Sequence, residues 1–279
     1  MSYAARLKQL HEGPEVLVLP NAWDLPSALL LADLPEVRAI GTTSAGLAAA
    51  AGRPDGEEVT LDQVLAVVAP ITAALAIPVT VDLEAGYGAE PAQVSRSIAA
   101  VVAAGAAGVN LEDGSVGGPG LDAADRHAAK IAAAREAGGP LVLNARTDTY
   151  WRSTGEPGER FAETVRRLRA YRAAGADCLF VPGFPTPGLP ADRQREAIRE
   201  LVGELDGAPI NLLARADLLP VGELAELGIR RLSMGSGLYR LGLAAVRSAM
   251  GELLRSGRPA ALATADELPY PELAKLLGG

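Results

Sequence analysis

Short apolar runs alternate with helical stretches along almost the whole chain, and this alternation is the feature that most limits its fold. Eight apolar runs are bounded by turn signals and have the length of strands. They are residues 16–19, 39–42, 79–81, 107–111, 141–145, 178–181, 210–213 and 231–234. Both faces of these runs are apolar, which is typical of a parallel sheet covered by helices on each side.

The stretches between the apolar runs carry helical periodicity, and several end in an Ala-Gly-Ala or Ala-Gly-Gly step that suits a helix C-cap. Examples are residues 61–76, 91–104, 123–137, 160–174 and 192–205. Eight strand and helix units over about 240 residues favour an α/β fold of the closed (β/α)8 TIM-barrel type. An open, doubly wound sheet, which usually has fewer strands, is the alternative.

The chain continues beyond its eighth predicted strand through residues 238–255 and then 258–277, where Pro259, Pro269 and Pro271 interrupt it. A barrel needs only one closing helix, so this surplus is expected to pack on the outside or on a neighbouring subunit. We therefore predict a catalytic α/β barrel domain over residues 1–245 and a C-terminal helical extension for oligomerisation over residues 246–279.

Charge and cysteine content exclude several classes of partner. The formal net charge is -8, and no run of Lys or Arg is long enough to follow a phosphate backbone, so nucleic acid is not expected. The single Cys178 excludes an intrachain disulfide framework and a thiolate metal cage. The sequence shows neither an uninterrupted apolar stretch of about 18 residues nor a secretory leader, which predicts a cytoplasmic protein without membrane contact. Small molecules and copies of the chain itself are the expected partners.

Acidic residues gather where three predicted strands give way to loops. The segments are 81–88 with Asp82 and Glu84, 110–114 with Glu112 and Asp113, and 144–148 with Asp148. The carboxyl ends of barrel strands converge at one mouth, so these acids predict a site for a divalent cation and an anionic substrate. The alternative is that the acids cap the following helices or are solvated. Of the pair at 112 and 113 only one can face inward, and Glu112 is favoured.

Arg146 ends an otherwise apolar strand, where a guanidinium is costly to bury unless it is paired. It offers a fixed fork for a carboxylate or enolate oxygen, or it forms a structural ion pair with Glu112 or Asp148; the two roles are compatible. The second strand leads into segment 41–46, whose small hydroxyls and glycines offer N–H groups to an anion. Asp55, within segment 52–56, fits a simple turn equally well.

Other polar residues fit less specific roles. His11 and His127 lie in helical stretches away from strand ends and are expected at the surface, whereas Cys178 begins the sixth strand and is expected in the core. Segment 233–237 is similar to a barrel phosphate-binding loop through Gly235 and Gly237, or is a helix-start turn. No lysine ends a strand, so a Schiff-base mechanism is not expected.

Five segments together resemble the isocitrate lyase and phosphoenolpyruvate mutase superfamily. They are residues 19–24, 52–55, 81–88, 110–113 and 145–148, in the order and at spacings compatible with that family. The resemblance implies an α/β barrel whose eighth helix is exchanged with a neighbouring subunit, in a tetramer or dimer. It also implies Mg²⁺ or Mn²⁺, an α-keto or enolpyruvate-like acid, and the breaking or forming of a C–C or C–P bond.

The resemblance also implies a role for individual residues. Asp82 would bind Mg²⁺ directly, with Glu84, Glu112 and Asp55 contacting it mainly through water. Arg146 would stabilise the enolate and, with Glu112 and Tyr87, forms the predicted catalytic set. The predicted substrate-binding residues are Trp23, Thr43, Ser44, Gly46, Asn144 and Asn211.

One loop departs from the family pattern. Lyases of the family carry a Lys-Lys/Arg-Cys-Gly-His loop after the fourth strand, with the Cys as acid/base, and phosphonate enzymes carry a Lys and an Asn there. Residues 113–122 of this chain read DGSVGGPGLD, with none of these groups. The sixth strand also ends in Pro182 and Gly183, where lyases of the family place a glutamate. The replacement proton donor is left open among Asp113, Ser115 and Tyr87.

The sequence therefore predicts a Mg²⁺-dependent, lyase-like enzyme that acts on a small 2-oxo or 2-hydroxy carboxylic acid through a pyruvate enolate. C–C cleavage or decarboxylation is favoured. The alternatives are a C–P bond enzyme of the phosphonopyruvate type, a non-catalytic carboxylate-binding barrel, and a phosphate-binding barrel that uses Gly235 and Gly237.

Overall fold

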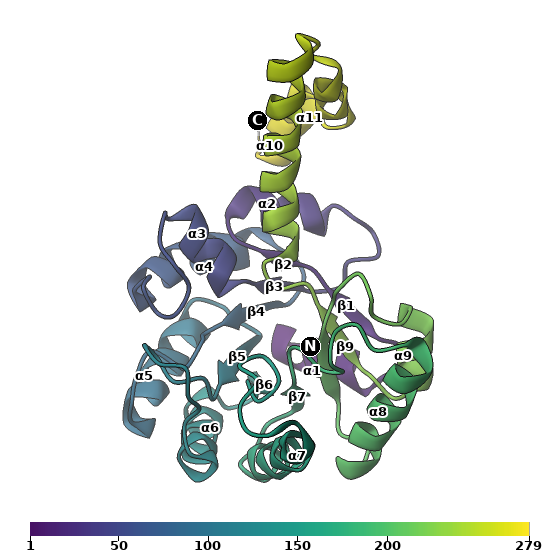
Figure 1. Ribbon diagram of the computed structural model, residues 1–279. Coiled ribbons are helices and arrows are strands. Elements are labelled where there is room, and N and C mark those ends of the chain that lie inside the picture. The colour runs from purple at the N-terminus through teal and green to yellow at the C-terminus, as the bar shows by residue number, and fades with distance from the viewer. Residues whose placement is uncertain (279) are drawn as a thin grey trace.

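Parallel strands form a nearly closed ring in the computed structural model, which describes residues 1–278 (Figure 1). Over these residues the sheet has nine strands in the order β1-β9-β8-β7-β6-β5-β4-β3-β2. They are β1 (Leu17–Leu19), β2 (Asn21–Ala22), β3 (Ile40–Thr42), β4 (Val79–Asp82), β5 (Gly108–Glu112), β6 (Val142–Arg146), β7 (Cys178–Phe180), β8 (Ile210–Leu213) and β9 (Arg231–Ser233).

Pro20 follows the first predicted strand, residues 16–19, and separates β1 from the short β2, which explains nine strands at eight barrel positions. β1 pairs with β9, and β2 pairs with β3, so the two halves close the ring from either side. Pro20 has no N–H for the ladder, but its carbonyl still accepts a hydrogen bond from the Gly41 backbone N at 2.9 Å. The predicted barrel is therefore confirmed, with one break in its first strand.

Helices surround the strands, and the five predicted examples are all present with small shifts of their ends. Four further helices, α1, α2, α3 and α9, were not among those examples. The helices before the last strand are α1 (Tyr3–Glu12), α2 (Leu25–Ala32), α3 (Ser44–Ala50), α4 (Leu61–Ala74), α5 (Pro91–Ala103), α6 (Ala124–Gly138), α7 (Pro157–Ala173), α8 (Ala191–Glu204) and α9 (Val221–Glu226). Side-chain caps fix the start of several of them; Asp24, Thr43 and Thr60 accept N–H groups of the first turns of α2, α3 and α4.

Polar side chains occupy the part of the barrel interior toward the carboxyl ends of the strands. A small apolar cluster that includes Leu7 and Leu17 closes the amino-terminal end, and the main apolar core lies between the strands and the helices. Arg231 of β9 reaches Asn110 of β5 across the ring, which places both side chains inside the barrel. Asn144 of β6, beside β5, and Asn211 of β8, beside β9, are also buried. TIM-barrel interiors are usually filled by Val, Ile and Leu, so this polar interior indicates a demand other than packing.

Both histidines are buried, so their expected surface location is wrong. His11 is 2% exposed because α1 covers the amino-terminal end of the barrel, where its Nδ1 donates to the Leu7 carbonyl at 2.8 Å. His127 of α6 is fully buried and lies edge-to-face against Tyr171 of α7. Burial lowers the pKa of each histidine to about 4. Cys178 is buried as expected, and burial raises the pKa of its thiol to about 12.

The C-terminal segment leaves the barrel as an arm, drawn in yellow-green in Figure 1. It consists of α10 (Gly237–Ser256), the 3-10 helix η1 (Ala260–Glu267) and α11 (Tyr270–Leu276). No residue of α10 is buried in the chain, and Leu241, Val246 and Leu254 are 66%, 64% and 80% exposed. The predicted domain border at 245/246 falls inside α10, which runs unbroken. Within residues 1–278, no helix combines the length and apolarity needed to cross a membrane.

Candidate active site

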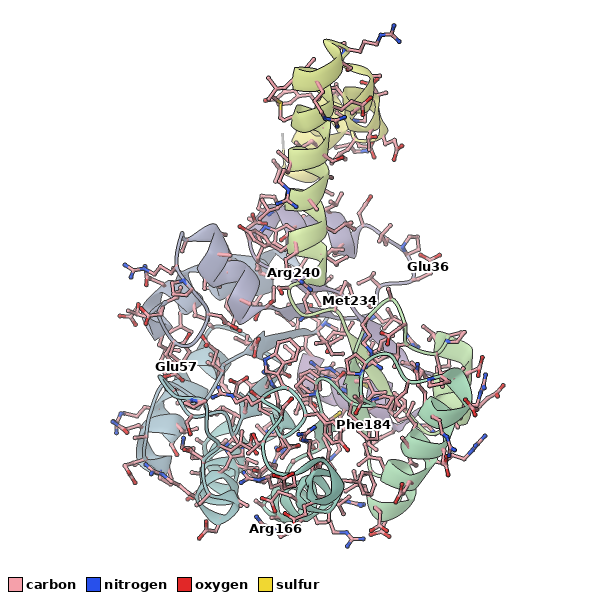
Figure 2. All side chains as sticks on the ribbon, viewed as in Figure 1. Glu36, Glu57, Arg166, Phe184, Met234 and Arg240 are labelled. Carbon is pink, nitrogen blue, oxygen red and sulfur yellow. The ribbon has the colours of Figure 1, made fainter. Side chains whose placement is uncertain are left out.

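A cavity opens where the carboxyl ends of the strands meet, and the loops after β3, β6, β7 and β9 contribute to it. Figure 2 shows Met234 at the base of α10, beside this end of the barrel. The lining residues are Asn21, Thr43, Ser44, Ala45, Asp55, Asp82, Asn110, Arg146, Trp151, Phe180, Pro182, Leu213, Ser233, Gly235 and Ser236.

Asp82 ends β4 with one carboxylate oxygen occupied and the other free. Its Oδ2 accepts hydrogen bonds from the Ser44 backbone N at 3.1 Å and from the Ser44 Oγ at 2.9 Å. Its backbone N donates to Thr42 Oγ1 at 2.9 Å. The Oδ1 atom is buried and has no hydrogen-bond partner among residues 1–278. A buried, unpaired carboxylate oxygen at a cavity wall is a suitable ligand for a cation.

Glu84 holds the loop that follows α3 against the barrel. Its Oε2 accepts the backbone N–H groups of Gly56 and Glu57 at 2.9 and 2.7 Å, and Tyr87 Oη donates to its Oε1 at 3.2 Å. Glu84 has φ 49°, a left-handed conformation that is rare for a residue with a side chain and clusters at functional sites. Burial, reinforced by the charges of Asp82 and Asp55, raises the pKa of Glu84 to about 7.

Asp55 is carried to the acid cluster by this anchored loop. It lines the cavity beside Asp82, although its sequence context fits a simple turn equally well. Burial is the main cause that raises its pKa above the usual value, and the Asp82 charge adds to the effect. The loop thereby brings a third carboxylate close to the free oxygen of Asp82.

Arg146 ends β6 and is clamped from two sides by carboxylates. Its Nη1 lies 2.8 Å from Glu112 Oε2, while its Nε and Nη2 donate to the two oxygens of Asp148 at 2.6 and 3.1 Å. Both ion pairs considered from the sequence are therefore present. Burial raises the pKa of Glu112 well above its usual range, against the opposing charge of Arg146. These ion pairs fix the guanidinium plane, and Arg146 lines the cavity.

Asp113 points away from the cavity, whereas Glu112 contacts Arg146 and lines a neighbouring hollow with Asp55 and Glu84. Asp113 is fully buried and accepts hydrogen bonds from Thr147 Oγ1 at 2.7 Å and from the Asp148 backbone N at 2.8 Å. Arg167 Nη1 and Tyr171 Oη donate to its Oδ2 at 3.0 and 2.7 Å. With its oxygens committed to these donors, Asp113 ties β5, β6 and α7 together and does not reach a ligand.

The glycine-rich loop after β5 forms a short antiparallel turn that Arg152 holds in place. Gly114 bridges to Leu121, and the Ser115 backbone N donates to the Gly120 carbonyl at 3.0 Å. Arg152 Nη1 donates to the carbonyls of Ser115 and Gly120, both at 3.1 Å. Arg152 Nε lies 3.3 Å from Asp148 Oδ2, the carboxylate that also holds Arg146. A chain of ion pairs thus connects the cavity wall to the loop.

The remaining predicted site residues divide between the cavity and its surroundings. Thr43 and Ser44 line the cavity, whereas Gly46 packs behind it, where a Cβ would lie 2.6 Å from Thr43 Cγ2. Trp23 lies edge-to-face against Tyr239 of α10 with ring centroids 5.2 Å apart. Tyr87 lines a separate hollow with Glu57, which Figure 2 labels.

Asn144 and Asn211 are buried below the cavity and do not line it. Sequence reasoning did not select several lining residues: Asn21, Asn110, Trp151, Phe180 and Ser233. A signal was available for Asn110, a polar residue at an interior position of an apolar strand. Asn21 follows Pro20, and its Oδ1 accepts the backbone N–H groups of Met234 and Gly235 at 2.8 and 3.0 Å.

The acids of the cavity fit a divalent cation that would be held mainly through water. No group of three His, Cys, Asp or Glu side chains within residues 1–278 is arranged as a ready-made metal cage. Mg²⁺ keeps several of its waters and usually needs only one or two carboxylates. Asp82 Oδ1 supplies one oxygen without a partner among residues 1–278, and Asp55 lines the same cavity.

Comparison with known proteins agrees with this geometry. The family profile described as Phosphoenolpyruvate phosphomutase matches residues 7–254. The chain belongs to this family. It is 38% identical over 245 residues to an uncharacterized protein of Mycobacterium tuberculosis (strain ATCC 25618 / H37Rv), covering 86% of this chain and 85% of that protein.

Two further relatives extend the comparison of this phosphoenolpyruvate phosphomutase family member. The oxaloacetate decarboxylase of Paraburkholderia xenovorans (strain LB400) is 28% identical over 263 residues, which cover 90% of this chain and 82% of that protein. A crystal structure from Burkholderia cenocepacia J2315, named as a candidate lyase/mutase, has a TM-score of 0.87 at 33% identity, covering 99% and 96% of the two chains. The predicted superfamily of lyases and mutases is confirmed, and the chain is an enzyme of that superfamily.

Proposed function

We propose that this enzyme is a lyase that depends on Mg²⁺ or Mn²⁺ and acts on a small 2-oxo or 2-hydroxy carboxylic acid through a pyruvate enolate. The observation that carries the proposal is the free Oδ1 of Asp82 on the same cavity as the fixed guanidinium of Arg146. Asp82 would bind a metal cation, and Arg146 would bind an anionic oxygen. The metal and the guanidinium would together supply positive charge to the carboxylate and carbonyl oxygens of one substrate. The relative named oxaloacetate decarboxylase supports this class of substrate.

The residues divide the work of holding the substrate. Arg146, kept in position by Glu112 and Asp148, would bind a substrate carboxylate or the enolate oxygen. Asp82 would hold the cation directly, and Asp55 and Glu84 would hold its waters. When bound, the cation supplies positive charge that stabilises the enolate. Ser44 orients Asp82 through two hydrogen bonds and places the start of α3 at the cavity.

The loop over residues 113–122 favours decarboxylation of a 2-oxo acid among the possible C–C cleavages. Cleavage of a 2-hydroxy acid needs a base that removes the hydroxyl proton, and this loop carries neither Cys nor Lys. Asp113 is turned into the core, and the Tyr87 hydroxyl donates to Glu84. Loss of CO₂ from a 3-carboxylated 2-oxo acid leaves the enolate directly, and water then protonates it. The reaction therefore needs no acid or base from the loop.

A panel of oxaloacetate, 2-methylisocitrate, 2,3-dimethylmalate and phosphonopyruvate, each with Mg²⁺ or Mn²⁺, tests the proposal. We expect pyruvate from oxaloacetate well above the spontaneous rate. Asp82→Ala should abolish this activity and metal binding by calorimetry without unfolding the barrel; Asp62→Ala, on exposed α4 surface, is the matched control. Turnover of phosphonopyruvate alone would instead support a C–P bond enzyme.

A non-catalytic carboxylate-binding barrel is the second candidate function, and the loop without acid or base groups favours it. Its signature would be binding of oxalate that requires Asp82 while no panel member reacts. Turnover of any panel member above the rate of the Asp82→Ala variant excludes this candidate.

We propose further that the arm formed by α10, η1 and α11 packs on a neighbouring copy of the chain in a dimer or tetramer, as helix exchange between subunits requires. The support is an apolar surface on α10 that the chain itself does not bury. The division into a barrel over residues 1–245 and an oligomerisation extension over residues 246–279 stays a prediction. The cytoplasmic location also stays a prediction.

A further inference from the structure

Arg231 is a fully buried arginine inside the barrel, and no carboxylate of residues 1–278 is paired with it. Its Nη2 donates to Asn110 Oδ1 at 3.2 Å, while its Nε and Nη1 have no hydrogen-bond partner among residues 1–278. Within the same residues, no acidic oxygen lies within 4.0 Å of its guanidinium. Burial lowers its pKa to about 10, so the group stays charged at neutral pH.

Arg231 differs from other buried basic side chains of this chain, which lie beside a carboxylate. Arg167 lies 3.0 Å from Asp113, and Lys130 lies 2.8 Å from Asp122. Removing a charge from water costs several times the thermal energy, and even a buried ion pair can often be replaced by apolar side chains of similar size with a neutral or stabilising effect. The stability of the fold alone therefore does not account for an unpaired guanidinium in the barrel interior.

Arg231 fixes the orientation of the Asn110 side chain. Asn110 Oδ1 accepts from Arg231 Nη2 and also from Asn144 Nδ2 at 2.8 Å. A guanidinium has no acceptor atom, so the oxygen of the Asn110 amide must face it. The Asn110 Nδ2 is left without a hydrogen bond to any described residue, and Asn110 lines the cavity. In the sheet Asn110 is the register partner of Asp82, the proposed cation ligand.

We propose that Arg231 is a positioning residue for the substrate. It directs the Asn110 amide N–H groups toward an oxygen of the bound 2-oxo acid, and its charge below the cavity floor favours the enolate over a less charged ligand. Asn110 is then a substrate-binding residue that shares the floor of the cavity with Asp82. The inference rests on the proposed function, because the ligand it concerns is the enolate of a 2-oxo acid.

Substitution of Arg231 by methionine tests the inference, because methionine keeps an unbranched chain and removes the charge. The probe is oxalate, a dianion that resembles the pyruvate enolate, titrated by calorimetry with Mg²⁺ present and compared with pyruvate. We expect Arg231→Met to weaken oxalate binding by about 10- to 100-fold, the loss of a hydrogen bond to a charged oxygen, and to weaken pyruvate binding less. The midpoint of thermal unfolding should stay unchanged or rise.

Two further variants separate positioning from structure. Asn110→Ala should weaken oxalate binding to a similar extent, and the double variant should lose little more than either single variant, because both act through one amide. Arg167→Met is the matched control, since it breaks a compensated buried pair and should lower the unfolding midpoint.

The outcomes distinguish this inference from the proposed function. Oxalate binding by the wild-type protein with an unchanged affinity in Arg231→Met and Asn110→Ala would overturn the role of Arg231 alone. A lowered unfolding midpoint with unchanged oxalate affinity would show that Arg231 is structural. A wild-type protein that binds no oxalate in the presence of Mg²⁺ would overturn the proposed function and this inference together.

Discussion

Substitution of Asp113 by asparagine should destabilise the barrel strongly although it changes only one atom of the side chain. In the structure its carboxylate accepts four hydrogen bonds, from Thr147, Asp148, Arg167 and Tyr171. Asparagine keeps one acceptor oxygen and turns the other atom into a donor, so the Asp148 N–H or the donors on Oδ2 lose their partner. The Arg167 guanidinium also loses its buried counter-charge.

The expected loss follows from these contacts. Breaking a buried ion pair typically costs about 3 to 5 kcal/mol, because one charge stays buried and uncompensated. Arg167 keeps Glu163 at 2.7 Å, which is partly exposed and compensates only in part. One further neutral hydrogen bond contributes about 1 kcal/mol. We therefore expect a loss of about 3 to 5 kcal/mol, or a fall of about 6 to 20 °C in the unfolding midpoint at 2 to 4 °C for each kcal/mol.

Urea unfolding followed by circular dichroism measures this loss. Asp62→Asn, at an exposed position of α4, is the matched control and should change stability by less than about 0.5 kcal/mol. The double variant Asp113→Asn with Arg167→Met should cost less than the sum of the two single variants, because no uncompensated guanidinium remains. A loss below about 1 kcal/mol for Asp113→Asn would refute the view that this carboxylate ties β5, β6 and α7 together.

Two other predictions concern pH and the arm. Because the folded-state pKa of His127 is about 4 and the unfolded value is near 6.5, the unfolded chain takes up a proton that the folded chain does not. The free energy of unfolding should therefore fall by up to about 3 kcal/mol as the pH drops from 6.5 to 4. Urea unfolding across this range should show a shallower pH dependence in His127→Phe, and equal slopes would contradict the assignment. Leu241→Glu and Val246→Glu should leave the circular dichroism spectrum unchanged and lower the molar mass by light scattering, whereas Val116→Glu on the exposed loop after β5 should not. A monomeric wild-type protein would contradict the oligomer, and an unchanged mass in both α10 variants would contradict the arm as its interface.

The fold was predictable because its signals are local. Eight apolar runs separated by helical stretches are visible along the chain, and the polar residues that end them, such as Asp82 and Arg146, interrupt an apolar pattern. The break at Pro20 had a signal as well, since proline removes a ladder donor. Each of these features depends on residues that are neighbours in sequence.

The missed features depend on contacts between distant segments. Asn110 and Arg231 meet across the barrel, and only the ring geometry shows that one orients the other. His127 is buried by its packing against Tyr171 of α7, a contact that the periodicity of α6 alone does not reveal. Glu112 and Asp113 are adjacent in sequence, but Glu112 contacts Arg146 whereas Asp113 contacts Arg167 of α7. The sequence thus located the acids and Arg146, whereas the polar network below them required the structure.

The pairing of the first strand with the last also has a consequence for how the protein is made. Leu17 of β1 pairs with Arg231 of β9, so the ring cannot close until residue 231 has left the ribosome. Until then the growing chain is an open sheet with two unpaired edges, which are sites for aggregation. The apolar surface of α10 follows within a few residues of β9, so it leaves the ribosome only after the last strand of the barrel. The order of the chain thus delays the segment that most needs a partner until a folded subunit can present it.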